Sequence, residues 1–232
     1  MKKVLGIAIV LAALGAVAFF VLSNPLGRLV KLAVESFGSD VVQAEIRVKS
    51  VDISTTDGRG KLIGLKLGNP KGFKADHALK ADKIDIEIEP TSIAQNVLVL
   101  HKVLIDAPHI IYESGKNGTN FDAIQRNVET YLGKGKGDKE DKSEGKKIII
   151  DSFIIRDAKV NYNNTIDLSL PDIELYNIGK KSNGATSAQV TRAIIAELNT
   201  KLALALAKAA AIGAVGGPAI GAGMAVKSIL GK

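Results

Sequence analysis

The chain has 232 residues, of which 46% are hydrophobic and 4% aromatic, and it contains no cysteine and no tryptophan. This length predicts one or two domains. The absence of cysteine excludes disulfides, thiolate metal sites and a cysteine nucleophile. With so few aromatic residues, a stacking surface for single-stranded nucleic acid is not expected, and no nucleic-acid partner is predicted. The net charge of +7 favours contact with anionic surfaces, lipid headgroups among them.

The first element is an uncharged run. Lys2 and Lys3 precede residues 4–22, which carry no charge. A run of this length can span the core of a bilayer as a helix. The two lysines favour an N-inside orientation, so the rest of the chain would be exported. We therefore expect a cytoplasmic stub and transmembrane anchor over residues 1–27. The alternative is a cleaved signal peptide, because Ala16-Val17-Ala18 has the form of a cleavage site, although the apolar run continues beyond it.

Residues 28–132 are predicted to form a first β block. An amphipathic helix runs from Pro25 to Phe37, with Gly38 as a plausible stop. Strands are expected at 44–53, 61–67, 81–89 and, as a pair, within 97–112. In the third of these, Ile84, Ile86 and Ile88 alternate with Asp85, Glu87 and Glu89. This alternation predicts a strand with one apolar face and one solvated carboxylate face.

The remaining segments are a helix, a linker, a second β block and a tail. A short helix is expected over 121–132, with Asn120 as a possible N-cap. Residues 133–147 contain no apolar side chain and predict a flexible charged linker. Short strands over 148–180 form the second block. Within 181–232, Thr186 to Gln189 has capping-box form, and a long Ala-rich helix should run from there to about Ala211. The Ala/Gly-rich tail, uncharged between Lys208 and Lys227, either associates with a membrane or packs on the domain.

A weak internal repeat links the two blocks. Residues 102–112 and 152–162 align without gaps at an offset of 50, with apolar matches and with Tyr112 against Tyr162. This indicates two passes of a similar pair of strands, one on each side of the linker.

No motif in the sequence indicates catalysis. His77, His101 and His109 have no neighbouring residues at metal-ligand spacing. Phosphate-binding loops, nucleophile elbows and dinucleotide fingerprints are absent from the sequence. We therefore predict a protein that is not an enzyme and that has no catalytic residues, no metal site and no cofactor.

The order of segments resembles the N-terminal module of the AsmA family. The most specific segments are Gly64-Leu65 with Leu67-Gly68-Asn69-Pro70 and Gly72-Phe73, the Ile84-Ile86-Ile88 strand, and Ile105, Pro108, Ile110 and Tyr112. The resemblance spans roughly residues 1–180. It implies a bacterial inner-membrane protein facing the periplasm, with a taco-shaped sheet whose apolar concave face holds acyl chains. It also implies a role in lipid homeostasis of the envelope or outer membrane.

The predicted fold is mainly β with flanking helices: the N-terminal transmembrane helix, a curved antiparallel sheet in two blocks and the long C-terminal helix. The first functional hypothesis is a lipid-binding protein whose partners are phospholipid acyl chains. Its apolar groove would be lined by Leu65, Leu67, Ile84, Ile86, Ile88, Val103, Ile105 and Ile110. The alternative is a membrane-anchored structural or assembly protein with a filled β-sandwich core and envelope protein partners. About ten strands at ~4.8 Å spacing make a groove only about 50 Å long, which is short for bridging two membranes alone.

Overall fold

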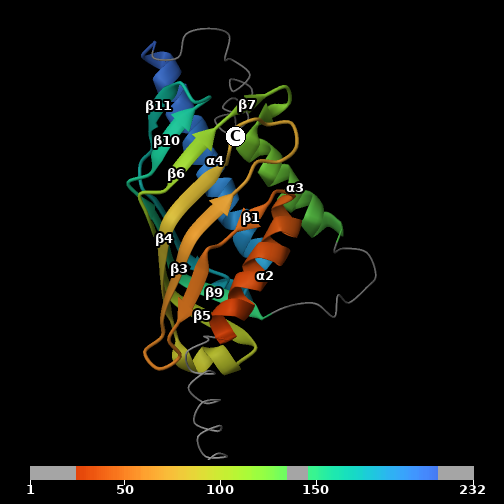
Figure 1. Ribbon diagram of the computed structural model, residues 1–232, viewed down its shortest axis with the longest axis vertical. Helices are drawn as coiled ribbons and strands as arrows, with labels where there is room; N and C mark the ends of the chain where they lie inside the picture. Colours follow the sequence, from red (N-terminus) through yellow and green to blue (C-terminus); the bar gives the residue numbers. More distant parts are fainter. Residues whose placement is uncertain (1–24, 135–145, 214–232) are drawn as a thin grey trace, which may run out of the picture.

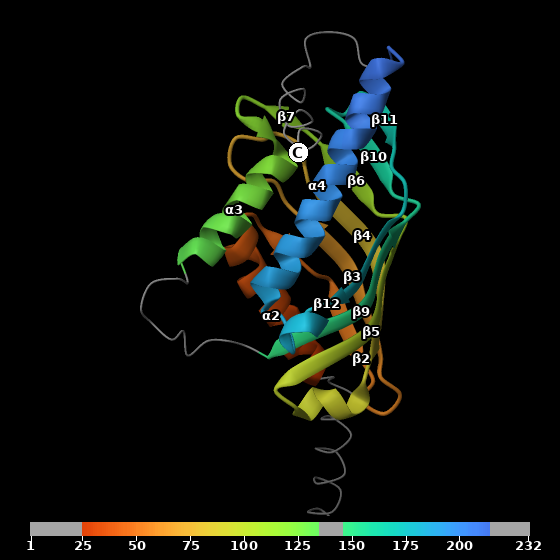
Figure 2. The same cartoon turned by 180° about the vertical axis from the view of Figure 1, so that it is seen from behind.

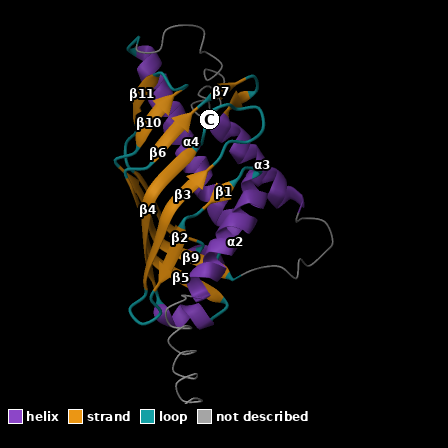
Figure 3. Ribbon diagram, in the orientation of Figure 1, coloured by secondary structure: helices purple, strands orange, loops and turns teal. Residues whose placement is uncertain are grey.

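The computed structural model describes residues 25–134 and 146–213 (Figure 1). Within them the protein is mainly β: a curled, open sheet forms a half-barrel, and three helices lie along its concave side (Figure 3). The prediction of a mainly β fold with flanking helices is confirmed at this level. The predicted anchor and the Ala/Gly-rich tail lie outside the described residues. Of the helices inside these two ranges, none is long and apolar enough to cross a membrane.

The elements follow in a simple order. The helices are α2 (Pro25–Val42), α3 (Asn120–Lys134) and α4 (Ser187–Ala211), with 3-10 helices η1 (Pro90–Ala94) and η2 (Lys180–Ser182). The strands of the first block are β1 (Ile46–Arg47), β2 (Ser50–Ile53), β3 (Arg59–Leu67), β4 (Leu79–Ile88), β5 (Val97–Asp106), β6 (His109–Tyr112), β7 (Ser114–Gly115) and β8 (Gly118–Thr119). Those of the second are β9 (Lys147–Arg156), β10 (Lys159–Tyr162), β11 (Ile166–Ser169) and β12 (Ile173–Ile178).

Both predicted blocks contribute to one ten-stranded sheet, and only β7 and β8 stand apart as a hairpin. Strand β4 pairs with β3 along one edge and with β5 and β6 along the other. The prediction of an antiparallel sheet is wrong for two pairs, since β5 with β9 and β6 with β10 are parallel. The reason is the connection between Tyr112 and Lys147, which is long and includes α3. A long crossover of this kind is what a parallel pair requires.

The internal repeat is the register of these parallel pairs. Val103 pairs with Phe153, Ile105 with Ile155, and Tyr112 with Tyr162, always at an offset of 50. Each copy bends at an equivalent point, where Ala107 has φ 47° and Asp157 has φ 52°. The Ala107 N–H donates to the carbonyl of Arg156 at 3.0 Å, which joins the two bends. Because both neighbours bend at the same level, the sheet curls as a unit.

Cross-strand neighbours form apolar rows on the concave face. One row consists of Leu62, Ile84, Ile105, Ile155 and Ile173, all buried. The next consists of Ile86, Val103, Phe153 and Leu175. Glu87, between the isoleucines of β4, is exposed. The one-sided strand that the alternation predicts is therefore present, and its apolar side faces the helices.

Helix α2 passes through the position predicted to stop it. Gly38 lies inside the helix, and a Cβ placed there would be 2.8 Å from Cδ1 of Ile46. The glycine therefore lets β1 approach α2 closely. The chain leaves the helix only after Val42, at Gln43, whose φ is 52°.

Helices α3 and α4 begin with reciprocal capping bonds. At α3, the Thr119 N–H donates to Asp122 and the Asp122 N–H donates to the Thr119 hydroxyl. Thr119 is therefore the cap, one residue before the predicted Asn120. At α4, the predicted capping box is confirmed: Thr186 and Gln189 bond each other's backbone N–H. The predicted end near Ala211 is also confirmed.

The bend at Ala107 gives a stability prediction. A left-handed conformation costs a residue with a Cβ about 1–2 kcal/mol, which exceeds the roughly 0.5–1 kcal/mol that the extra freedom of glycine in the unfolded chain costs. We expect Ala107→Gly to raise the free energy of unfolding by about 1 kcal/mol in urea denaturation of the full chain in detergent.

The control is Ala158, which packs against the core and lacks a positive φ. Ala158→Gly should lower the free energy of unfolding by about 0.5–1 kcal/mol. A loss of stability in Ala107→Gly would contradict the conformation assigned to this bend.

Candidate functional site

The eight residues predicted to line a groove lie on the sheet. Leu65 and Ile86 are half-buried and pack against the apolar core cluster. The other six are at most 8% exposed: Leu67, Ile84, Ile88, Val103, Ile105 and Ile110. All six except Ile88 belong to the cluster beneath the helices. Their contact with lipid stays a prediction, but their burial shows that much of the concave face is covered by protein.

Coverage of the concave face is incomplete at one end, where half-buried apolar residues lie beside the buried Ile88 and Ile150. This is the lower end in Figure 1, where α2 begins. Ile155 and Ile173, higher up, are 2% and 0% exposed. We name the half-buried apolar residues nearer the lower end the lower-end apolar surface: Ile86, Leu100, Ile148, Leu175 and Ile178.

The placement of the helices accounts for this incomplete cover. Helix α2 packs mainly against β1, β2 and α3, whereas α4 packs against β9, β11, β12 and α3. The helices therefore approach the curled sheet from its two edges (Figure 2). Asn199 of α4 fixes α3 to α4 by donating to Asp122 at 2.9 Å and Gln125 at 2.8 Å. Phe37 of α2 makes an edge contact with Tyr131 of α3, with ring centroids 5.8 Å apart.

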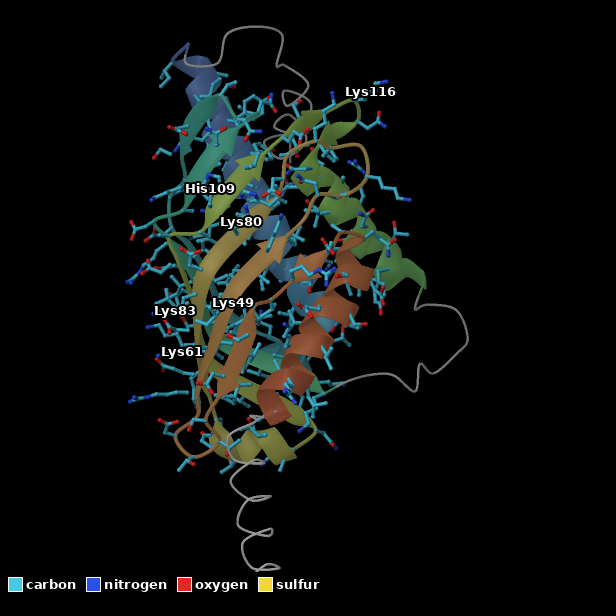
Figure 4. The ribbon with its side chains drawn as sticks, viewed as in Figure 1. Lys49, Lys61, Lys80, Lys83, His109 and Lys116 are labelled. Carbon is cyan, nitrogen blue, oxygen red and sulfur yellow. The ribbon has the colours of Figure 1, made fainter. Side chains whose placement is uncertain are left out.

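The outer face of the sheet is polar. Figure 4 shows Lys61 and Lys83 projecting from it, away from the helices. An open depression of about 650 Å³ lies on this face beside the β2–β3 turn. Charged side chains of both signs line it, among them Arg59, Glu87 and Lys102. This lining does not suit an acyl chain.

His101, at the edge of this depression, is held by carboxylates on both sides. Its Nδ1 lies 3.0 Å from Asp151 and its Nε2 lies 3.3 Å from Glu89. Asp151, and secondarily Glu89, raise the pKa of His101 above its ordinary value. The hydrogen bond from Thr91 lowers the pKa of Glu89, and the bond to His101 lowers that of Asp151. Since both ring nitrogens are engaged, the arrangement ties β5 to β9 and to the residue that follows β4.

A second histidine cluster was not predicted from the sequence. His77 Nε2 lies 2.8 Å from Nδ1 of His109, although the two are 32 residues apart. Burial lowers the pKa of His77. The Lys66 and Lys80 ammonium groups hold the pKa of Asp76, which contacts His77, well below its usual range. Within residues 25–134 and 146–213, no three histidine or carboxylate groups are arranged to hold a metal ion.

A buried polar network connects the segments that carry the AsmA resemblance. Asn120 is 0% exposed, and its side-chain amide donates to Asn69 and to the carbonyl of Ile111, each at 2.8 Å. Its oxygen accepts from the N–H of Glu113 and of Phe121. The Glu113 carboxylate accepts from the backbone of the loop after Pro70, at Lys74 and Ala75. The turn at Asn69 is therefore clamped to the start of α3, so these segments position the loop.

Comparison with family models, with curated proteins and with solved structures found no match. The membership of the AsmA family stays a prediction.

The network around Asn120 gives a second prediction. Asn120→Ala leaves the Ile111 carbonyl and the Glu113 N–H without their buried partner, and each such group costs about 1–3 kcal/mol. We expect a loss of about 3 kcal/mol in the free energy of unfolding, measured by urea denaturation.

The matched control is Asn117, an exposed asparagine in the turn of the β7–β8 hairpin, which precedes α3. Asn117→Ala should change the stability by less than about 0.5 kcal/mol. Equal effects of the two substitutions would rule out the buried network as a source of stability.

The pKa values of His101 and His77 should lie on opposite sides of the ordinary histidine value of about 6.5. A raised folded pKa means that His101 stabilises the fold below about pH 6.5, and this contribution is lost as the pH rises through its folded pKa. The lowered pKa of His77 means that stability falls as the pH drops below about 6.5. NMR titration of the ring protons should place the His101 midpoint above that of His77.

The variant His101→Gln separates these effects. Relative to the unmodified chain, it should lose more stability at about pH 5.5 than at about pH 8.5. The same loss at both pH values would refute the ionic role of His101.

Proposed function

We propose that this protein is a lipid-binding protein of AsmA type, anchored in the bacterial inner membrane and facing the periplasm. It would act in lipid homeostasis of the envelope and outer membrane by holding phospholipid acyl chains, without catalysis. The observation that carries the proposal is the lower-end apolar surface. Its residues come from β4, β5, β9 and β12, and they lie at the end of the sheet where α2 begins. In the sequence, α2 follows the uncharged run 4–22 directly.

The energetics require only apolar contact. Each buried acyl methylene contributes about 0.8 kcal/mol, so a chain segment of several methylenes can be held without polar contacts. Half-buried side chains such as Leu100, Leu175 and Ile178 still have apolar area exposed to water. An acyl chain that covered them would add to the existing core and would not need to replace it.

A second candidate function rests on the covered part of the concave face. Ile110, Phe121 and Ile124 are 0% exposed, so the sheet and helices leave no apolar surface free at this level. This favours the alternative of a membrane-anchored assembly protein with envelope protein partners. Under this alternative the lower-end apolar surface would contact protein.

Photo-crosslinking distinguishes the two functions. The full chain would be reconstituted in vesicles whose phospholipid carries a diazirine in the acyl chain, irradiated, and digested for mass spectrometry. We expect lipid adducts on peptides that contain Leu100, Ile148 and Ile178, and none on Ile110 or Val160, which are at most 3% exposed. Adducts within residues 4–22 would show that the chain has inserted.

A pair of variants tests the side of the sheet. Ile178→Glu places a carboxylate within the lower-end apolar surface and should reduce adducts there several-fold. Leu104→Glu makes the same kind of change on the outer face, where Leu104 pairs with Asp85, and should leave the adducts unchanged. If residues 4–22 are labelled but the lower-end apolar surface is not, the lipid-binding function is wrong.

A further inference from the structure

The lower end of the molecule also carries a group of basic side chains. Lys146 and Lys147 lie at the start of β9, and Lys180 and Lys181 lie in η2. The segment after η2 lies beside the start of β9. Ala185 forms an isolated β-bridge with Ile148, and Gly184 approaches Lys147 closely. Figures 1 and 2 both show these elements at the end where α2 begins. We name Arg28, Lys146, Lys147, Lys180 and Lys181 the basic rim.

Most of the positive charge of the basic rim is not neutralised. All five side chains belong to exposed residues. Lys180 lies 3.6 Å from Asp151, which is itself bonded to His101. Lys146 donates to the carbonyl of Ile93 in η1, which fixes its position without cancelling its charge. Among the described residues, Arg28, Lys147 and Lys181 form no ion pair with an acidic group.

Exposed leucines lie beside the basic rim. Leu29 and Leu32, in the first two turns of α2, are 65% and 61% exposed. They share this part of the helix with Arg28 and Lys31. Lys31 bonds the carbonyl of Lys49 and lies 4.0 Å from the Glu35 carboxylate. Apolar side chains next to basic ones are the combination that binds the interface of an anionic membrane.

We infer that the basic rim docks the folded body, lower end first, onto a leaflet containing anionic phospholipid. The inference rests on the proposed function, because the same end carries the lower-end apolar surface. Lysine and arginine side chains near such a leaflet each increase association by about fivefold, and the attraction extends over about one Debye length. Docking would place the lower-end apolar surface against the headgroup region, where an acyl chain enters.

The lack of native cysteine allows a direct test. Ala94, exposed in η1 at the lower end, would be replaced by cysteine in the full chain and labelled with an environment-sensitive fluorophore. The labelled chain would be placed in nanodiscs of phosphatidylcholine, with or without about 30% phosphatidylglycerol. We expect emission to increase in the anionic discs and to return to the neutral-disc value in about 0.5 M salt.

Two charge-reversal variants complete the test. Replacement of Lys146, Lys147, Lys180 and Lys181 by glutamate should lower association at least about a hundredfold and abolish the response to anionic lipid. The control variant should retain the response to anionic lipid. In it, glutamate replaces four exposed lysines away from the lower end: Lys71, Lys83, Lys116 and Lys159. Each set contains one ion-paired lysine, Lys180 or Lys83. Circular dichroism would show that both variants are folded.

The inference is wrong if emission is the same in neutral and anionic discs, or if both variants respond alike. The acyl-chain adducts report separately on the proposed function. Adducts at Leu100 and Ile178 without a response to anionic lipid would retain lipid binding and reject docking by the basic rim. A response to anionic lipid without adducts would retain docking and reject lipid binding.

Discussion

The apolar concave face of the curled sheet is the constraint on which the rest of the structure depends. The register places apolar side chains in continuous rows across β3, β4, β5, β9 and β12, so burying one member of a row requires burying its neighbours. An open half-barrel cannot close on itself to do this, as a barrel does. The helices α2 and α4 meet the requirement from the two edges, and α3 joins them. At the lower end the cover is incomplete, since Leu100 and Ile178 are half-buried beside the buried Ile88 and Ile150.

Much of the fold could be predicted because local signals agreed with it. The alternation of Ile84 to Glu89, the capping box at Thr186 and the periodicity of α4 each specify an element within a short window. The repeat at an offset of 50 identified residues that prove to be direct neighbours. It did not reveal that their strands are parallel, because equivalent residues in two similar strands match in sequence whichever way the strands run. Direction depends on the crossover through α3, whose path local pattern does not determine.

What the sequence did not reveal depends on contacts between distant residues. Gly38 has the pattern of a helix stop, yet it lies inside α2, where Ile46 packs closely over it. The pairing of His77 with His109 and of Asn69 with Asn120 joins residues 32 and 51 apart. Spacing rules for metal or catalytic sites search within a few residues, so they cannot find such pairs. The predicted groove residues were the part of the site that was easiest to predict from the sequence, because alternation identifies an apolar face. Alternation does not identify what covers that face.

The lower end brings together features that have no structural reason to coincide. A filled core needs neither a rim of lysines nor exposed leucines at the start of α2. In an isolated domain the leucines leave apolar area in water, and the lysines add to the net positive charge. Arg28, Lys147 and Lys181 lie near half-buried apolar residues of the concave face and near the point where the uncharged run 4–22 joins the body in sequence. A leaflet with anionic headgroups would satisfy all three features at once, since its headgroups attract the lysines, its interface accepts the leucines, and its acyl chains match the half-buried rows.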